Sequence, residues 1–247
     1  NYGVGVNHID LSAAASHGIT VSNTPGVLTD ATADLTLTLM LMLCRRAGEG
    51  ERELRAGEWS GWRPTHLVGR QMTGKTLGII GMGRIGRAVA HRAHFGFGME
   101  IVFQNRSPVD DGAGVGGRQL ASVAEVCAAS DFVSLHCAAT PETRHILGRE
   151  ALAAMSPSAY VINTARGDVV DEDALVAALE SGAIGGAGLD VFQGEPKVNP
   201  AIMAAPNTVL LPHLGSATEE TRVAMGMKVV ENARAFAMGE VLPDKVG

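Results

Sequence analysis

Four side chains in the second half of the sequence have the types and the spacing needed for acid–base chemistry on a charged substrate. Arg166 follows the apolar segment VINTA, Asp190 follows GGAGL, and His213 follows TVLLP. If these segments are parallel strands, the three residues stand at their carboxyl ends, where an open α/β sheet binds its ligands, and are expected to face one crevice. Glu195 lies a few residues beyond Asp190, in a loop that can return toward His213.

The chemistry that these residues favour is hydride transfer between a dinucleotide and a carbonyl or alcohol. A guanidinium grips a carboxylate bidentately, which makes Arg166 the candidate for holding a 2-oxo acid. A histidine whose charged form is held by a carboxylate can protonate a developing alkoxide near neutral pH, a role that suits His213 with Glu195. The structural alternative is that Arg166 caps a loop, Glu195 is a solvated charge and His213 ends a strand.

The stretch Thr76–Ala93 predicts where the dinucleotide binds. Leu77–Ile80 is a short apolar run fit for a buried strand, and Gly81, Gly83 and Gly86 form G-x-G-x-x-G before a helical pattern. The first glycine permits a tight turn, the second lets the backbone approach a pyrophosphate, and the third lets the helix pack on the strand. The phosphates then lie at the helix N-terminus. A Gly-rich structural turn is the alternative.

Strands alternating with helices through the chain predict an α/β fold with a doubly wound, mostly parallel sheet of the Rossmann type. The expected strands are Gly18–Ser22, Leu77–Ile80, Glu100–Phe103, Phe132–His136, Tyr160–Thr164, Gly186–Val191 and Val209–Leu211. Besides the helix after the glycine turn, the expected helices are Asp10–Ser16, Thr29 to about Arg46, one opening at a capping box Ser122–Glu125, Asp171–Ser181, and one from a capping box Ser216–Glu219 to about Met238.

Residues 26–70 are expected to serve association with a partner. The helix that opens at Thr29 is apolar nearly all round, which predicts that it is buried, with a subunit interface as one possibility. The polar segment Gly48–Arg70 follows it and carries Trp59 and Trp62. An exposed arm with two tryptophans usually finds a partner surface.

Composition narrows the class of protein. Hydrophobic residues make up 46% of the 247 residues and charged ones 19%, which is typical of a globular chain with one large domain or two smaller ones. The net charge of -6 comes with no basic block, which argues against a nucleic-acid partner. The most apolar stretch, Leu35–Cys44, is far shorter than the roughly 20 residues of a membrane span. A small molecule is therefore the expected partner.

The three cysteines Cys44, Cys127 and Cys137 show no Cys-x-x-Cys or Cys/His ligand spacing. This pattern predicts a reducing, cytoplasmic setting and no structural metal.

The residues after the second strand of the dinucleotide motif favour NADPH as the cofactor. A domain that selects NAD places an acid about 20 residues beyond the glycines, where it binds the ribose 2′-hydroxyl. Asn105 stands there instead, followed by Arg106 and Ser107, which supply a cation and a hydroxyl for a 2′-phosphate. If Arg106 is only a solvated surface charge, the neutral Asn105 allows NADH as well.

Five segments in order resemble the signature segments of the D-isomer-specific 2-hydroxyacid dehydrogenases, and the resemblance covers essentially the whole chain. They are NTPGVLTDATAD, GIIGMGRIGRAVA, VINTARGDVVDEDAL, GLDVFQGEP and LPHLGSAT. Within the family the chain looks most like glyoxylate/hydroxypyruvate reductases. The resemblance implies that Arg166 binds and orients substrate, that Glu195 and His213 form the acid–base pair, and that Asp190 lies near the nicotinamide.

The same resemblance implies further site residues and a homodimer. Gly3–Gly5 matches the loop whose backbone amides, at Val4 and Gly5, hold the substrate carboxylate. Trp62 is expected to reach the pocket of the partner, which would restrict the site to small substrates such as glyoxylate and hydroxypyruvate. The expected cofactor-binding residues are Gly81, Gly83, Arg84, Ile85, Gly86, Asn105, Arg106, Ser107, Thr164, Ala165, Asp190 and Gly215.

The resemblance also divides the chain into two lobes. Family members carry further residues before this point, which form most of a flavodoxin-like substrate-binding lobe. Residues 1–24 and 217–247 are therefore expected to be remnants of that lobe. Residues 25–216 are expected to form the dinucleotide-binding domain, including the dimerisation helix and arm of residues 26–70.

Two kinds of alternative stay open at this point. The chain could be another member of the family, such as a phosphoglycerate, formate or phosphite dehydrogenase. A formate enzyme is expected to carry glutamine where Glu195 stands, and phosphoglycerate dehydrogenase often adds a regulatory domain. The fold also serves nucleotide-sensing proteins that resemble dehydrogenase-like corepressors, and fold alone does not choose between sensor and enzyme. Turnover of a 2-oxo acid would discriminate.

Overall fold

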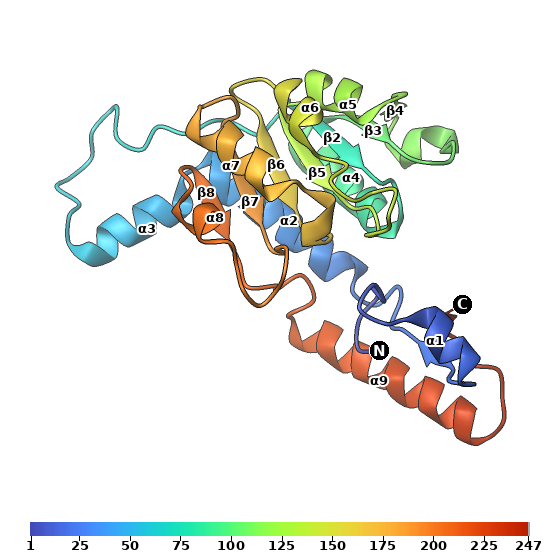
Figure 1. Cartoon of the computed structure of the whole chain (residues 1–247). Coiled ribbons are helices and arrows are strands. Elements are labelled where there is room, and N and C mark those ends of the chain that lie inside the picture. Colours follow the sequence, from blue (N-terminus) through green and yellow to red (C-terminus); the bar gives the residue numbers. More distant parts are fainter. Residues whose placement is uncertain (247) are drawn as a thin grey trace.

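A computed structural model describes residues 1–246 and contains a seven-stranded parallel sheet with helices on both faces (Figure 1). The strand order is β4-β3-β2-β5-β6-β7-β8. The strands are β2 (Thr76–Ile80), β3 (Glu100–Gln104), β4 (Arg118–Gln119), β5 (Phe132–Leu135), β6 (Tyr160–Asn163), β7 (Gly186–Leu189) and β8 (Thr208–Leu210). The predicted doubly wound α/β fold is confirmed.

The order of the strands creates a crevice at one end of the sheet. The chain runs outward from β2 through β3 to β4, then returns to β5 on the other side of β2. The connections after β2 and β5 therefore leave in opposite directions. Such a switch point opens a cleft at the carboxyl ends of the strands, where ligands of this kind of sheet bind.

The helices bury the two faces of the sheet in two apolar clusters. α2 (Thr29–Cys44) and α4 (Arg84–Phe97) pack on one face, with Leu39, Ile79 and Phe103 fully buried between them and the strands. On the other face lie α5 (Val123–Ala129), α6 (Arg149–Ala153), α7 (Glu172–Glu180) and α8 (Pro200–Ala204). The near-continuous apolar strands are those expected of a parallel sheet that is covered on both sides.

The two ends of the chain come together beside α9 (Glu219–Ala237), which runs away from the sheet (Figure 1). β1 (Val21–Ser22) pairs antiparallel with β9 (Lys245–Val246), and α1 (Leu11–Ser16) lies next to them in the figure. The Tyr2 hydroxyl also donates to the backbone oxygen of Arg222 at 2.6 Å. Residues 1–24 and the segment after residue 217 are thus in contact.

Several elements differ from the predictions. The segment expected to be a polar arm starts with a helix, α3 (Ala47–Ala56), which has no buried residue and ends at Gly57 in a left-handed conformation. Its charged sequence carries no apolar stripe to reveal it. The helices α6 and α8 and the strand β4 were not anticipated either, because each is five residues or shorter.

The predicted capping box at Ser216 is wrong. Thr218 is the N-cap of α9, since its Oγ1 accepts the backbone N–H of Thr221 at 3.2 Å. Ser216 and Thr218 are both residue types that cap helices, so the motif was placed two positions too early. The other capping box is confirmed, with Ser122 Oγ accepting the N–H of Glu125 at 3.2 Å.

Asp244 fastens the C-terminal segment to α9. Lys228 Nζ lies 3.0 Å from both carboxylate oxygens, and Asn232 Nδ2 donates to Oδ2 at 3.0 Å. Only 8% of the Asp244 side chain is exposed. Burial opposes its ionisation, but the bonds from Asn232 and Lys228 outweigh burial and hold the pKa of Asp244 below its usual value.

We expect Asp244→Asn to lower the free energy of unfolding near pH 7 by about 1–3 kcal/mol, because it weakens hydrogen bonds to a charged group. A depressed folded pKa gives stability that is present above the unfolded pKa and is lost as the pH falls through the folded pKa. Urea unfolding of the unaltered protein and of Asp244→Asn, at about pH 7 and about pH 2, measures the difference in their free energies of unfolding. This difference should shrink at the lower pH. Glu231→Gln, at an exposed position of α9, is the control. An equal difference at both pH values would contradict the account.

Candidate active site

The glycine turn after β2 has the shape that a dinucleotide pyrophosphate needs. Gly81 has φ 97°, and a Cβ there would lie 2.7 Å from the backbone nitrogen of Cys137. A Cβ at Gly86 would lie 2.3 Å from the backbone oxygen of Gly81, so α4 packs directly on the turn. The helix opens with Arg84, Ile85 and Gly86, and in the described chain no side chain caps it at Gly83. Its first amides are therefore available to a phosphate.

The loop after β3 is tied to this turn by Asn105. Its Oδ1 accepts the N–H of Met82 at 3.1 Å, and its Nδ2 donates to the backbone oxygen of Ser107 at 2.9 Å. Both ends of the amide are thus engaged within the protein. Asn105 shapes the loop and holds Arg106 and Ser107 beside the glycine turn.

Glu195 and His213 meet at the carboxyl ends of β7 and β8. His213 Nδ1 lies 2.7 Å from Glu195 Oε2, and Glu195 Oε1 accepts the backbone N–H of Phe192 at 2.9 Å. The side chains are 49% and 33% exposed, so the pair is open to a ligand. The structure therefore brings together the two residues that sequence reasoning paired, and within residues 1–246 His213 Nε2 has no hydrogen-bond partner.

Asp190 lies beneath this pair, and its placement differs from the expectation that it faces the crevice. The residue is fully buried, and its Oδ1 and Oδ2 accept the backbone N–H groups of Leu214 at 2.6 Å and Gly215 at 2.8 Å. Burial raises the pKa of Asp190, although these bonds and the neighbouring His213 oppose the shift. Its carboxylate thereby satisfies two backbone amides of the loop after His213.

Arg166 reaches the N-terminal loop from the end of β6. Its Nη1 donates to the backbone oxygen of Ala165 at 2.6 Å, and its Nε donates to Asn7 Oδ1 at 3.3 Å. A Cβ at Gly5 would lie only 1.9 Å from Arg166 Nη2, so the guanidinium lies against Gly5. Burial lowers the pKa of Arg166 and the negative charge of Glu195 opposes this shift, which places the two side chains within electrostatic range.

Val4 and Gly5 are held by side chains that leave their amides free. The backbone oxygen of Val4 accepts Asn23 Nδ2 at 2.8 Å, and that of Gly5 accepts Asn1 Nδ2 at 2.9 Å. Across residues 1–246, neither the Val4 nor the Gly5 amide donates a hydrogen bond. Two free N–H groups beside a half-buried guanidinium form a surface suited to an anion.

The first half of α2 contacts the loops after β6 and β8, which carry Thr164 and Gly215. Thr36 Oγ1 lies 3.0 Å from Thr164 Oγ1, and Thr32 Oγ1 donates to the backbone oxygen of Gly215 at 3.0 Å. The amide of Ala165 is held by Asn163 Oδ1 at 3.0 Å. Helix α2 thereby fixes the loops after β6 and β8 in relation to each other.

The single chain leaves Trp62 exposed. It is 83% exposed, in the segment that projects beyond α3 (Figure 1).

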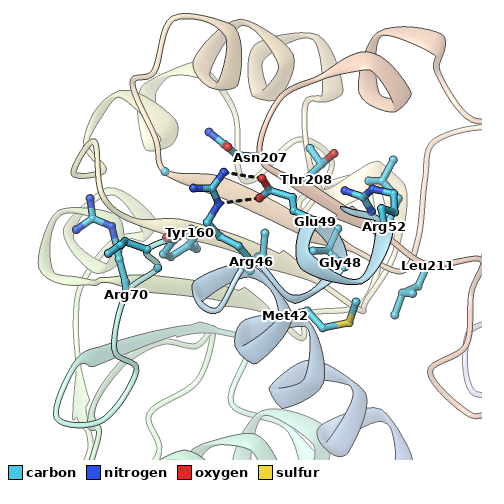
Figure 2. A pocket seen from close by; sticks show the side chains of 16 residues that line it. Met42, Arg46, Gly48, Glu49, Arg52, Arg70, Tyr160, Asn207, Thr208 and Leu211 are labelled. Carbon is cyan, nitrogen blue, oxygen red and sulfur yellow. Dashed lines mark hydrogen bonds and ion pairs between the residues drawn. The ribbon is translucent and has the colours of Figure 1, made fainter. Parts of the chain in front are cut away.

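A cavity of about 320 Å³ lies between α2–α3, the amino end of β6 and the length of the edge strand β8 (Figure 2). The bidentate Arg46–Glu49 pair, with N···O distances of 3.0 and 2.6 Å, points into it between Arg52 and Asn207. None of the crevice residues described above lines it. It is therefore separate from the candidate active site.

Sequence reasoning missed Glu172 and Gln193, which support the loop of Glu195. The backbone N–H of Gln193 donates to Glu172 Oε1 at 2.7 Å. Glu172 is buried on the apolar face of α7, four and seven residues before Val176 and Leu179. A carboxylate in phase with an apolar stripe was the available signal, since such a group needs an internal partner.

Within residues 1–246 no group of three His, Cys, Asp or Glu side chains could hold a metal ion. Nor is any helix in that range long and apolar enough to cross a membrane.

Relatives of known type share this sequence and this fold. A family model described as D-isomer specific 2-hydroxyacid dehydrogenase, NAD binding domain, matches residues 37–215. A glyoxylate reductase of Thermococcus litoralis is 47% identical over 99% of this chain and 75% of its own length. A glyoxylate reductase of Pyrococcus furiosus is 44% identical over 100% of this chain and 74% of its own.

Solved structures agree with these relatives. The NADPH-dependent glyoxylate/hydroxypyruvate reductase of Sinorhizobium meliloti, in complex with NADP and malonate, has a TM-score of 0.93 at 39% identity, over 100% of this chain and 76% of that one. A protein of Thermus thermophilus has a TM-score of 0.92 at 48% identity, over 100% and 77%.

The fold and the glycine turn therefore define a nicotinamide-dependent dehydrogenase. The chain belongs to the D-isomer specific 2-hydroxyacid dehydrogenase family, as its motifs predicted. It is thus placed among enzymes, as an oxidoreductase of the type that reduces 2-oxo acids.

Proposed function

We propose that this chain reduces glyoxylate and hydroxypyruvate to the 2-hydroxy acids with NADPH, using His213 as the proton donor. The 2.7 Å contact between His213 Nδ1 and Glu195 Oε2 is the observation that carries the proposal. The glyoxylate reductases among the relatives support this choice of substrate.

Each residue has a distinct part in the reaction. The guanidinium of Arg166 binds the substrate carboxylate, and the free amides of Val4 and Gly5 donate to the same group. The nicotinamide supplies the hydride to carbon 2. His213 Nε2 donates a proton to the oxygen that becomes the alcohol, while Glu195 stabilises the imidazolium before transfer and fixes the ring. Asp190 keeps the loop of His213 in place.

His213→Ala is expected to lower kcat by about 10²–10⁴-fold, the usual contribution of a general acid, with cofactor affinity retained. Arg166→Lys is expected to act mainly on KM, because an ammonium cannot bind the carboxylate bidentately. Steady-state kinetics with glyoxylate separate the two effects, and fluorescence titration measures cofactor binding. A His213→Ala enzyme with unchanged kcat would refute the assignment.

NADPH is the proposed cofactor, although NADH also fits if Arg106 makes no contact. The contacts of Asn105 tie this loop to the glycine turn, which supports the proposal that the Arg106 cation and the Ser107 hydroxyl receive a ribose 2′-phosphate. The residue directly after β3 is the neutral Asn105, and not an acid that would repel that phosphate. The NADPH-dependent relative of known structure supports the same choice.

Arg106→Ala is expected to weaken NADPH binding by about ten- to a hundredfold, the equivalent of one charge-assisted bond, and to leave NADH binding nearly unchanged. Arg149→Ala, which removes an exposed arginine from α6, is the matched control and should alter neither cofactor. Catalytic efficiency with both cofactors tests this. A preference for NADH in the unaltered enzyme, or equal weakening of both cofactors, would overturn it.

A homodimer is proposed as the assembly. The arm exposes large apolar side chains, namely Leu54, Trp59, Trp62 and Val68. The edge strand β8 is only partly buried, and the cavity of Figure 2 opens between it and α2–α3. Exposed apolar groups and an uncovered sheet edge together favour a second subunit on this side.

The partner's arm is proposed to restrict the site to small substrates through Trp62. Trp62→Ala should raise the turnover of phenylpyruvate relative to glyoxylate, while Trp59→Ala on the same arm should not. Light scattering at micromolar concentration should give the mass of a dimer. A monomer, or faster turnover of phenylpyruvate than of glyoxylate by the unaltered enzyme, would contradict this part of the proposal.

The division into lobes is part of the same proposal. Residues 1–24 and 217–247 are assigned to the substrate-binding lobe, and residues 25–216 to the dinucleotide-binding domain. The pairing of β1 with β9 and the contact of Tyr2 with α9 support this grouping.

The thiols fit a reducing, cytoplasmic compartment. Cys44, Cys127 and Cys137 are free. Burial raises the pKa of Cys127 to about 12 and that of Cys137 to about 11, so both stay protonated and unreactive at neutral pH.

A further inference from the structure

Glu172 is a buried carboxylate that contacts the loop of the acid–base pair. It is the first residue of α7 and is 6% exposed. Its Oε1 accepts the backbone N–H of Gln193 at 2.7 Å, and in the described chain it forms no ion pair. A buried carboxylate without a cation costs free energy, which hydrogen bonds and a helix N-terminus reduce. The hydrogen bond from the Gln193 amide therefore indicates what the Glu172 carboxylate supports.

Two glutamates hold two consecutive amides of this loop. Glu195 Oε1 accepts the N–H of Phe192 at 2.9 Å, and Glu172 Oε1 accepts the N–H of Gln193. The Gln193 side chain adds a bond to the backbone oxygen of Val170 at 2.6 Å and lies 3.0 Å from His145 Nε2. These hydrogen bonds fix the backbone of the turn that carries Glu195.

The same peptide lies against the loop of Arg166. A Cβ at Gly167 would lie 2.0 Å from the carbonyl carbon of Phe192 and 2.3 Å from the nitrogen of Gln193. Glycine is required there because the two backbones touch. A shift of the Phe192–Gln193 peptide would therefore displace Glu195 directly and press on the residue next to Arg166.

We propose that Glu172 is a positioning residue that sets the orientation of Glu195 toward His213. This inference rests on the proposed roles of Glu195 and His213. Without the acceptor on Glu172, the Gln193 amide loses its partner and the loop relaxes toward other acceptors. Glu195 then holds His213 less well, the charged ring is less favoured, and the proton donor is lost at a lower pH.

Three variants test the proposal. Glu172→Ala should lower kcat for glyoxylate reduction by about ten- to a hundredfold, as small misplacements of catalytic groups do, and should change KM less than kcat. It should also move the alkaline limb of the kcat–pH profile to lower pH and speed hydrogen exchange of the Gln193 amide. Glu172→Gln keeps an oxygen acceptor for the Gln193 amide. It should therefore retain most of kcat and most of the alkaline limb at its original pH. Asp173→Ala removes the exposed neighbouring acid and is the control.

Glu195→Gln separates this inference from the function on which it rests. If Glu195→Gln moves the alkaline limb and Glu172→Ala does not, the inference is overturned and the proposed function stands. If Glu195→Gln leaves the limb in place, the acid–base assignment fails and the inference fails with it. Should Glu172→Ala not fold, Glu172→Asp, which is one methylene shorter, is expected to give a smaller shift of the same sign. An unshifted limb in a folded Glu172→Asp enzyme would then refute the proposal.

Discussion

The buried carboxylate of Asp190 is the interaction on which the candidate site depends. It stands at the end of β7 and accepts the amides of Leu214 and Gly215, while its own backbone oxygen accepts the N–H of His213 at 3.0 Å. His213 has φ 57°, a left-handed conformation that costs a non-glycine residue about 1–3 kcal/mol. The three hydrogen bonds that Asp190 accepts hold this conformation and keep the His213 ring at the crevice.

This arrangement carries a cost that depends on pH. Burial raises the pKa of Asp190 above the value of an unfolded chain, so the native state binds this proton to a higher pH. The native state is therefore favoured by Asp190 below the unfolded pKa, and this advantage is lost as the pH rises through the folded pKa. Ionisation of Asp190 in the native state therefore costs stability. Asp190 lies between the two strand ends that carry Glu195 and His213. This supporting role in the site accounts for a buried carboxyl group that lowers stability when it is ionised.

Much of the fold and part of the site follow from local sequence rules. The strand, glycine turn and helix around Gly81 are specified by short-range backbone requirements, so they could be predicted. The rule that ligands bind at the carboxyl ends of parallel strands also placed Arg166 and His213 at one edge of the sheet. The loops that carry them are neighbours because β6, β7 and β8 are adjacent in the sheet.

The parts that could not be predicted depend on tertiary contacts. Asp190 faces the loop beneath the crevice because it accepts two amides that lie 24 and 25 residues further along the chain. The periodicity of the local sequence carries no information about such a contact. The Glu172–Gln193 contact joins residues 21 positions apart, so neither residue alone indicates it. Helix α3 has no apolar face to predict it, and the cap of α9 was ambiguous because two capping residue types stand close together.

The transfer of a labelled hydride tests the account most directly. The chain is incubated with hydroxypyruvate and NADPH that carries deuterium in the transferable position of its nicotinamide, and the product is analysed by mass spectrometry. The account predicts D-glycerate with deuterium at carbon 2. Formation of no glycerate while both ligands bind, or of glycerate without the label, would contradict it.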